Sequence, residues 1–247
     1  MKDSRRVAVV IPAYNEARSL RAVVTDTLAR VDLVIVVDDG SNDGTSHEIR
    51  DLPVRIIRHE KNLGKSCSLV DGFRAALESD AEAVVTLDGD GQHRPQDIER
   101  LLAESGRHPM SIIIGSRLHD KQNIPSSRYR ANRFANFWIA WAAGYPISDS
   151  QSGFRVYPSK VLEQLLTRME MRRAFVLESE ILIRAGWRNI YSRAVPIPAI
   201  YEQTGRPSHF RPIRDIALIV LMVAKHLIAR GFHLRGLIAS LRRTTLV

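Results

Sequence analysis

The stretch AVVTLDGDGQHRP, residues 83–95, decides the fold of this chain. Its first residues form a short apolar run rich in β-branched side chains, which predicts a buried strand over residues 83–87. Pro95 is well placed as the first residue of a following helix. Asp88 and Asp90 therefore leave the carboxyl end of a strand, which is the edge where open α/β sheets bind ligands.

The carboxylates of this loop indicate a metal site. Gly89 lies between them and has no side chain, so the backbone there can approach a ligand closely. Carboxylate oxygens on a short loop suit a hard divalent cation that substrate phosphates help to hold. A solvated turn is the alternative, because Asp and Gly are common turn residues. The apolar strand before the loop, and a similar pair at Asp38 and Asp39, favour the metal site.

Composition allows one large domain or two small ones. The chain has 247 residues, and 45% of them are hydrophobic, which suffices for a core. Its 36 Lys and Arg residues exceed its 27 acids, and the net charge of +9 favours anionic partners. The single cysteine, Cys67, excludes an internal disulfide and fits a reducing cytosolic setting. We expect neither a signal peptide nor a membrane-spanning helix, because no apolar run is long enough.

Apolar strands alternate with helical stretches along the first half of the chain. Strands are predicted at residues 7–12, 33–37, 54–57, 83–87 and 112–114, and helices at residues 17–30, 62–77 and 95–102. Pro12 is expected to end the first strand, because proline has no N–H to donate. This alternation predicts a parallel, doubly wound α/β sheet. Further helices are predicted at residues 126–144, 175–185 and 212–230, and an extended segment at residues 190–200.

Five loops carry recognisable motifs. They are VIPAYNE at 10–16, VDDGS at 37–41, LDGD at 87–90, GSR at 115–117 and DSQSGF at 149–154. Taken in this order, each at a predicted strand end, they resemble family 2 glycosyltransferases over residues 7–210. The resemblance is strongest to the branch that includes dolichyl- and polyprenyl-phosphate mannosyl- and glucosyltransferases. It implies a GT-A-type (Rossmann-like) fold, which is a doubly wound mixed sheet with helices on both faces.

The resemblance also implies a domain organisation. Residues 1–210 would form a single domain, with a nucleotide-binding half at residues 1–117 and an acceptor-binding half at residues 118–210. Residues 211–247 would form a basic and apolar helical segment at the C-terminal end.

Sugar transfer from a nucleoside-diphosphate sugar builds negative charge on the leaving diphosphate, so a metal and cationic groups must stabilise that charge. By resemblance, Asp88, Asp90 and Gln92 hold Mg²⁺ or Mn²⁺, and Asp90 is the strongest single candidate. Asp88, Gly89 and Asp90 would also contact the nucleotide sugar.

The pocket for the base and ribose is assigned by the same resemblance. Its candidate residues are Pro12, Tyr14, Glu16 and Asp39. An acid at a helix start is the alternative for Glu16, because the helix dipole favours negative charge there. Asp38 is expected to be a hydrogen-bonded turn residue instead.

Arg117 and Asp149 are the remaining catalytic candidates. Arg117 matches the Gly-x-Arg of the family and is expected to contact a phosphate, with a surface salt bridge as the alternative. Asp149 is the candidate general base if the acceptor is a hydroxyl group. If the acceptor is a lipid phosphate, its oxygen is already anionic, and Asp149 would orient the acceptor or Arg117. Capping a turn is the alternative for Asp149.

Three further charged residues lie close to the motifs. Lys65 is at a predicted helix start, where it either meets a phosphate or is solvated. Glu178 and Glu180 point to different faces of a helix, so one of them is expected to reach the site and the other to be solvated.

The loop at residues 205–210 departs from the branch that the chain otherwise resembles. Prenyl-phosphate sugar transferases usually show an arginine followed by Gly-x-Ser-Lys. This chain has Gln203 at the arginine position and His209 at the lysine position. The departure implies a phosphate clamp that is weaker in fixed charge, or one that is rebuilt from Arg206 and His209. A surface or packing role is the alternative for His209.

The last forty residues are basic and apolar together. Asp215 is their single acid, and residues 216–224 are apolar on every side, so they must be buried in protein, in a partner or in lipid. An interfacial anchor on the inner, cytoplasmic face of a membrane fits this mixture. Packing on the sheet or contact in a homo-oligomer is the alternative. No nucleic-acid-binding motif is present, so no nucleic-acid partner is expected.

The sequence therefore predicts an inverting, metal-dependent glycosyltransferase that uses a nucleoside-diphosphate sugar. The expected acceptor is a polyprenyl phosphate, and a glycan or glycolipid hydroxyl is the alternative. A catalytically silent nucleotide-binding module and a nucleic-acid-binding protein are hypotheses of other classes.

Overall fold

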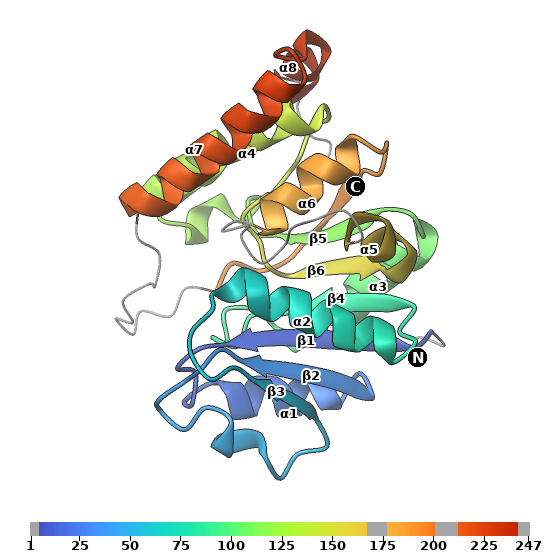
Figure 1. The fold of residues 1–247 in the computed structure, drawn as a ribbon, viewed down its shortest axis with the longest axis vertical. Helices are drawn as coiled ribbons and strands as arrows, with labels where there is room; N and C mark the ends of the chain where they lie inside the picture. The colour runs from blue at the N-terminus through green and yellow to red at the C-terminus, as the bar shows by residue number, and fades with distance from the viewer. Residues whose placement is uncertain (1–4, 167–176, 201–211, 242–247) are drawn as a thin grey trace.

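The sheet of this protein has seven strands in the part of the chain that the computed structural model describes, namely residues 5–166, 177–200 and 212–241. Their order across the sheet is β3-β2-β1-β4-β6-β5-β7, of which Figure 1 labels all but β7. The strands are β1 Val7–Ala13, β2 Leu33–Asp38, β3 Arg55–Arg58, β4 Ala83–Thr86, β5 Ile112–Ser116, β6 Arg155–Pro158 and β7 Ser192–Pro196.

The sheet is mixed, because β6 runs opposite to its two neighbours. β1 pairs in parallel with β2 and β4, β2 with β3, and β5 with β7, whereas β6 is antiparallel to β4 and β5. The hydroxyl of Thr86 at the carboxyl end of β4 donates a 2.6 Å hydrogen bond to the Gly153 carbonyl. The chain thus enters β6 at that edge and has to run back along the sheet. This corrects the simpler expectation of an entirely parallel sheet.

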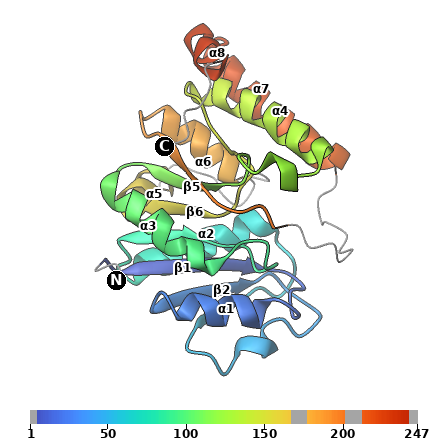
Figure 2. The same cartoon turned by 180° about the vertical axis from the view of Figure 1, so that it is seen from behind.

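Helices cover both faces of the sheet, as Figures 1 and 2 show from opposite sides. The helices are α1 Leu20–Leu28, α2 Lys65–Glu78, α3 Ile98–Arg107, α4 Ser126–Ala143, α5 Ser159–Leu166, α6 Leu177–Gly186, α7 Pro212–Ala229 and α8 Leu234–Leu241. Short 3₁₀ turns are η1 His47–Ile49, η2 Pro95–Asp97 and η3 Lys121–Asn123.

Alternating residues of the strands build two cores. In β1, Val9 and Ile11 pack with residues of α1 and α3, while Ala8 and Val10 pack with residues of α2 on the other face. A strand that is apolar at successive positions is what a sheet covered on both faces requires. The predicted α/β class, with a doubly wound mixed sheet and helices on both faces, is therefore the observed architecture.

Several predicted boundaries need correction. Pro12 lies inside β1, opposite Val37, so the expectation that it ends the strand is wrong. β4 pairs with β1 only as far as Val10, and a missing N–H is tolerated where a strand is bonded on one side. The helix expected from residue 17 begins at Leu20, because the preceding residues form a turn on the Glu16 carbonyl.

Helix α5 was not expected from the sequence, and α8 was expected only as part of the helical segment at residues 211–247, without bounds of its own. Each of them has only eight residues. Short helices depend on tertiary packing for their stability, so a local pattern is a weak guide to them. Helix α8 packs against α4 beside α7, as both views show.

Helix α7 is only partly buried. Val223 and Leu227 are 3% and 4% exposed, whereas Val220 and Leu221 are 50% and 66% exposed. The side chains of its first residues are not described. In the described part of the chain, no helix combines the length and the hydrophobicity that crossing a bilayer requires.

Gly72 provides a test of how tightly α2 packs on the sheet. A Cβ atom at Gly72 would lie 2.3 Å from Cγ1 of Val10 in β1. We expect Gly72→Ala to lower the free energy of unfolding by about 1–3 kcal/mol through overpacking. Urea denaturation measures this change.

Gly106→Ala in α3 is the matched control. A Cβ atom there would have its nearest neighbour, Nη2 of Arg5, at 3.8 Å. This variant should be neutral or gain up to about 1 kcal/mol from helix propensity. Equal stability of the two variants would contradict the packing argument.

Candidate functional site

The carboxyl edge of the sheet gathers the five motif loops. The loops after β1, β2, β4 and β5 leave this edge, and the loop before β6 returns to it. A Cβ atom at Gly153, in that last loop, would lie 2.8 Å from Oδ2 of Asp88. The LDGD and DSQSGF motifs, which are about sixty residues apart in sequence, are therefore in contact.

Asp88 lies between two cationic or potentially cationic side chains. Nζ of Lys65 is 2.6 Å from Oδ1 of Asp88 and 3.4 Å from Oε1 of Glu178, and Nε2 of His93 is 3.7 Å from Oδ2 of Asp88. Burial by itself would raise the pKa of Asp88, but Lys65 and His93 outweigh it and hold this pKa far below its usual range. Asp88 is therefore ionised at neutral pH.

Asp90 has a different electrostatic environment. Burial raises its pKa, and the negative charge of Asp88 raises it further. Its Oδ1 accepts a 2.9 Å hydrogen bond from the backbone N–H of Gln92, which closes the loop. Two carboxylates that repel each other are stabilised when a divalent cation binds between them.

The donor set fits a metal that is only partly ligated by protein. Among the described residues, no three His, Cys, Asp or Glu side chains converge to form a complete metal site. Mg²⁺ is commonly held by one or two carboxylates together with water and substrate phosphates. Asp88, Asp90 and the carboxamide of Gln92 are the candidate protein ligands.

The loop after β1 is tied to the loop after β4. The hydroxyl of Ser19 lies 2.8 Å from the Gly89 carbonyl, to which it donates, and 3.2 Å from Oε2 of Glu16. Glu16 therefore lies next to the LDGD loop, where the sequence predicts a donor contact. Tyr14 in the same loop and Pro12 near the end of β1 are partly exposed.

The loop after β1 is also tied to the VDDGS loop. The backbone N–H of Asn15 donates to the Ser41 hydroxyl at 2.9 Å, and the N–H of Asn42 donates to the Asn15 side chain at 3.0 Å. Asn15 has a φ of 57°, in the left-handed region that asparagine tolerates better than most residues. Asp38 accepts the N–H of Ser41 at 2.9 Å and is the turn residue that the sequence predicts.

Asp39 is buried and accepts several hydrogen bonds. Its oxygens accept the backbone N–H groups of Leu63 and Gly64, both at 2.8 Å, and Nδ1 of His59 is 2.7 Å from its Oδ1. The other ring nitrogen of His59 is 3.2 Å from Oδ2 of Asp71 in α2. Asp39 thus holds the loop that leads to Lys65. The sequence predicts that Asp39 also contacts the nucleotide, in addition to this structural role.

Asp149 is 1% exposed and accepts three backbone hydrogen bonds. The donors are the N–H groups of Arg117 at 3.1 Å, Ser152 at 3.2 Å and Gln151 at 3.3 Å. These bonds use the carboxylate to close its own loop and to hold the backbone of Arg117. The geometry favours the turn-capping and orienting roles of Asp149 over that of a general base.

Arg155 is one residue of this site that sequence reasoning missed. Its guanidinium is fully buried and donates to the carbonyls of Ser152 and Ser150, both at 2.8 Å, and of Glu178 at 2.7 Å. It therefore joins the DSQSGF loop to the start of α6. An arginine in an otherwise apolar strand was the available signal, since a charge at such a position needs compensating partners.

The remaining charged and histidine residues near the motifs differ in what the structure shows of them. Glu178 reaches the site, as expected for one member of its pair, and Glu180 forms an ion pair with Arg184 at 2.6 Å instead of being fully solvated. His93 is 4% exposed, contacts the ring of Phe154 and was not singled out from the sequence. Arg206 and His209 lie outside the described residues.

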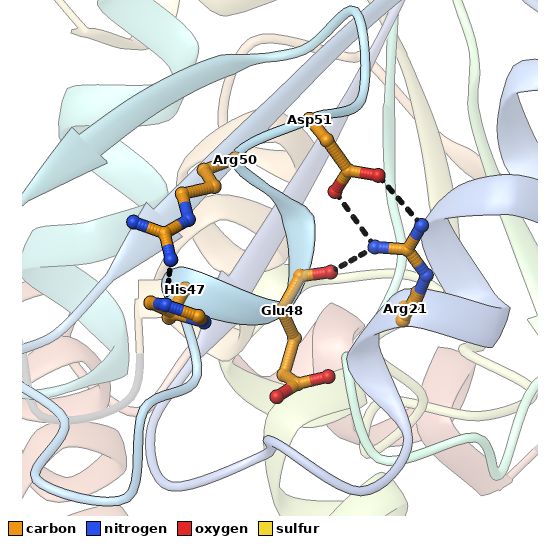
Figure 3. A pocket seen from close by; sticks show the side chains of 5 residues that line it. All are labelled: Arg21, His47, Glu48, Arg50 and Asp51. Carbon is orange, nitrogen blue, oxygen red and sulfur yellow. Dashed lines mark hydrogen bonds and ion pairs between the residues drawn. The ribbon is translucent and has the colours of Figure 1, made fainter.

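A separate pocket lies between α1 and η1. Figure 3 shows that its lining is charged, with Arg21 paired to both oxygens of Asp51 at 2.7 Å and bonded to the Glu48 carbonyl. None of its residues belongs to the five motifs. The guanidinium of Arg21 is already engaged within the protein.

Arg155 gives a testable prediction. Arg155→Met would leave three buried carbonyls without their donor, and we expect the free energy of unfolding to fall by roughly 3 kcal/mol or more. Chemical denaturation measures the loss. Arg55→Met in β3 is the control, because both side chains of its 3.2 Å ion pair with Glu78 are exposed, and such a pair is worth at most about 1 kcal/mol. Equal losses would contradict the proposed importance of the buried guanidinium.

Comparison with known proteins shows which family this chain belongs to. The model of the family "Glycosyl transferase family 2" matches residues 8–166. The UDP-N-acetylglucosamine–dolichyl-phosphate N-acetylglucosaminyltransferase of Methanococcus voltae is 30% identical over 218 residues, which cover 80% of this chain and 86% of that protein. The undecaprenyl-phosphate mannosyltransferase of Micrococcus luteus is 31% identical, with 65% of this chain and 69% of that protein covered.

Solved structures show the same fold. Glucosyl-3-phosphoglycerate synthase from Mycobacterium tuberculosis, in complex with Mn²⁺ and uridine-diphosphate-glucose, superposes with a TM-score of 0.64 at 20% identity, covering 92% of this chain and 80% of that one. This similarity concerns the fold alone. The sequence matches confirm the predicted family, and this chain is a glycosyltransferase that belongs to family 2.

Proposed function

We propose that this glycosyltransferase is inverting and metal-dependent, and that it moves a sugar from a nucleoside-diphosphate sugar to a polyprenyl phosphate. The observation that carries this proposal is the pairing of Asp88 and Asp90 at the carboxyl edge of the sheet, where burial and mutual repulsion raise the pKa of Asp90. A bound divalent cation would neutralise the charge that develops on the leaving diphosphate.

The residues of the chain have separate roles in this proposal. Asp88, Asp90 and Gln92 hold the cation, and Pro12, Tyr14, Glu16 and Asp39 line the place of the nucleoside. Their loops are cross-linked by the hydrogen bonds of Ser19 and Asn15, so they form one preorganised edge. Arg117 supplies a positive charge for a phosphate of the donor or the acceptor.

The environment of Asp149 favours an anionic acceptor. A general base needs a free carboxylate oxygen within reach of the acceptor hydroxyl. Asp149 is buried and bonded to three backbone N–H groups, so it is poorly placed to take a proton. A phosphate oxygen needs no base, and the names of the dolichyl- and undecaprenyl-phosphate relatives support such an acceptor. Direct attack of that oxygen on the anomeric carbon inverts its configuration.

A lipid-linked acceptor requires access to a membrane surface. Exposed apolar side chains gather on α4, α7, α8 and the turn between the last two, and they are Phe134, Val220, Leu221, Ile228, Phe232, Leu234, Ile238 and Leu241. Arg128, Arg130 and Arg133 are exposed on α4. We therefore place this apolar and basic surface on the anionic inner face of a membrane. Contact between copies of the chain is the alternative use of the same surface.

The metal site can be tested by nucleotide binding. Asp90→Asn should weaken Mn²⁺-dependent binding of the nucleoside diphosphate roughly tenfold or more, because it removes the charge that attracts the cation. Calorimetric titration with UDP and with GDP, each with and without Mn²⁺, measures this and identifies the donor class. Asp26→Asn on the exposed face of α1 should bind like the wild type. Unchanged affinity of Asp90→Asn would contradict the assignment.

The acceptor is tested by sugar transfer. The wild-type chain should move radiolabelled sugar from the nucleotide that it binds to undecaprenyl phosphate, and the product should extract into organic solvent. Transfer to a glycolipid hydroxyl instead would support the alternative acceptor and restore Asp149 as a base candidate. Nucleotide binding without any transfer would support a silent module.

The membrane surface is tested by vesicle binding. Leu234 and Ile238 are 70% and 59% exposed and lie four residues apart, so they share one face of α8. Leu234→Gln with Ile238→Gln should reduce co-sedimentation with anionic vesicles several-fold, because apolar insertion is lost. Met110→Gln, on an exposed residue before β5, is the control. A double variant that binds vesicles like the wild type but loses self-association would favour the oligomer.

A further inference from the structure

Lys65 occupies an electrostatically unusual position. It is the first residue of α2, where the positive end of the helix dipole disfavours a cation. The hydrogen bonds from Leu63 and Gly64 to Asp39 fix the backbone that leads to it. Its ammonium is therefore held at the carboxyl edge of the sheet despite an unfavourable helix terminus.

The carboxylates of Asp88 and Glu178 compensate for this position. The side chain of Lys65 is 43% exposed, and its ammonium nevertheless contacts both carboxylates. The charges of Asp88 and Glu178 raise the pKa of Lys65, so the side chain stays charged. A Cβ atom at Gly153 would lie 2.8 Å from Oδ2 of Asp88, 2.9 Å from Nζ of Lys65 and 3.0 Å from Oε1 of Glu178. The three charged groups thus converge over a residue that has no side chain.

We propose that Lys65 is a built-in counter-cation that competes with the divalent metal for Asp88 and so sets the metal affinity of the site. The proposal rests on the proposed function, because it takes Asp88 as a metal ligand. Nζ lies 2.6 Å from Oδ1, and His93 faces Oδ2 at 3.7 Å, so both oxygens of Asp88 have a neighbour that a metal must displace or move. The ammonium and the metal cannot both occupy the same lone pairs.

Glu178 receives the ammonium when the metal takes Asp88. Oε1 of Glu178 is buried and accepts no hydrogen bond from any residue that the structure describes, although Lys65 lies 3.4 Å away. A shift of Nζ on the order of half an ångström would bring it to the usual length of a charge-assisted hydrogen bond. The ammonium of Lys65 thus loses its hydrogen bond to Asp88 and gains one to Glu178.

The charge balance agrees with this exchange. With His93 neutral, the ionised carboxylates of Asp88, Asp90 and Glu178 would carry three negative charges and Lys65 one positive charge, which leaves two negative charges. One divalent cation neutralises them. Glu178 lies on α6 in the proposed acceptor-binding half, whereas Asp88 lies in the nucleotide-binding half, so metal binding also changes a contact between the halves.

The test is metal binding without nucleotide. The signal of free Mn²⁺ in electron paramagnetic resonance gives the affinity of the full chain, and Lys65→Met should bind Mn²⁺ about tenfold more tightly than the wild type. Lys61→Met removes the same charge from an exposed residue of the adjoining loop and should change the affinity less than about twofold, since salt screens exposed charges. Equal or weaker affinity of Lys65→Met, or an equal gain in Lys61→Met, would overturn the proposal.

A double-mutant cycle tests the role of Glu178. Glu178→Gln should weaken Mn²⁺ binding in the wild-type background, because it leaves the ammonium on Asp88 alone. Most of this loss should disappear in the Lys65→Met background if Glu178 acts through Lys65. A loss of the same size in both backgrounds would show that Glu178 acts on the metal directly and would overturn its role as the receiving carboxylate.

Asp90→Asn separates this proposal from the proposed function. If Asp90→Asn abolishes Mn²⁺ binding while Lys65→Met binds with wild-type affinity, the metal site stands and the competition by Lys65 fails. If wild type and Lys65→Met bind no Mn²⁺, either alone or with UDP or GDP, the metal-dependent function and the competition fail together.

Discussion

The reversal of β6 is the constraint on which the site depends. β6 lies antiparallel between β4 and β5, so the chain must approach it from the carboxyl edge of the sheet. The DSQSGF loop is thereby placed on the LDGD loop, with Gly153 against Asp88. Buried Arg155 stabilises this approach by donating to three carbonyls, one of them at the start of α6.

Charge is balanced locally at the same edge. Asp88 is held ionised by Lys65 and His93, whereas the pKa of Asp90 is raised by burial and by Asp88. Neighbouring carboxylates with opposite pKa shifts are typical of sites prepared for a charged ligand. Asp39 and Asp149, by contrast, are engaged with backbone N–H groups. Four acids that look alike in sequence thus have two kinds of environment: Asp88 and Asp90 lie among other charged groups, whereas Asp39 and Asp149 hold the backbone of a loop.

Much of the fold was predictable because its signals are local. Buried parallel strands appear as apolar runs such as residues 33–37, and their ends appear as Asp- and Gly-rich loops. The family and the GT-A-type fold follow from the order of these loops. Pro12 was misjudged because its tolerance depends on where β4 stops pairing with β1. Helix α5 was missed because an eight-residue helix depends on packing, here against α6 and β6.

The sequence by itself determined the strands, the order of the motif loops and the Asp88-Gly89-Asp90 turn, because each depends on neighbouring residues. Only the tertiary structure decided which acid faces which partner. The contacts of Lys65 with Asp88 and Glu178, and of Asp149 with the backbone of Arg117, join residues far apart in the chain. Such contacts follow from the direction of β6 and from burial, and no local pattern of residues contains either.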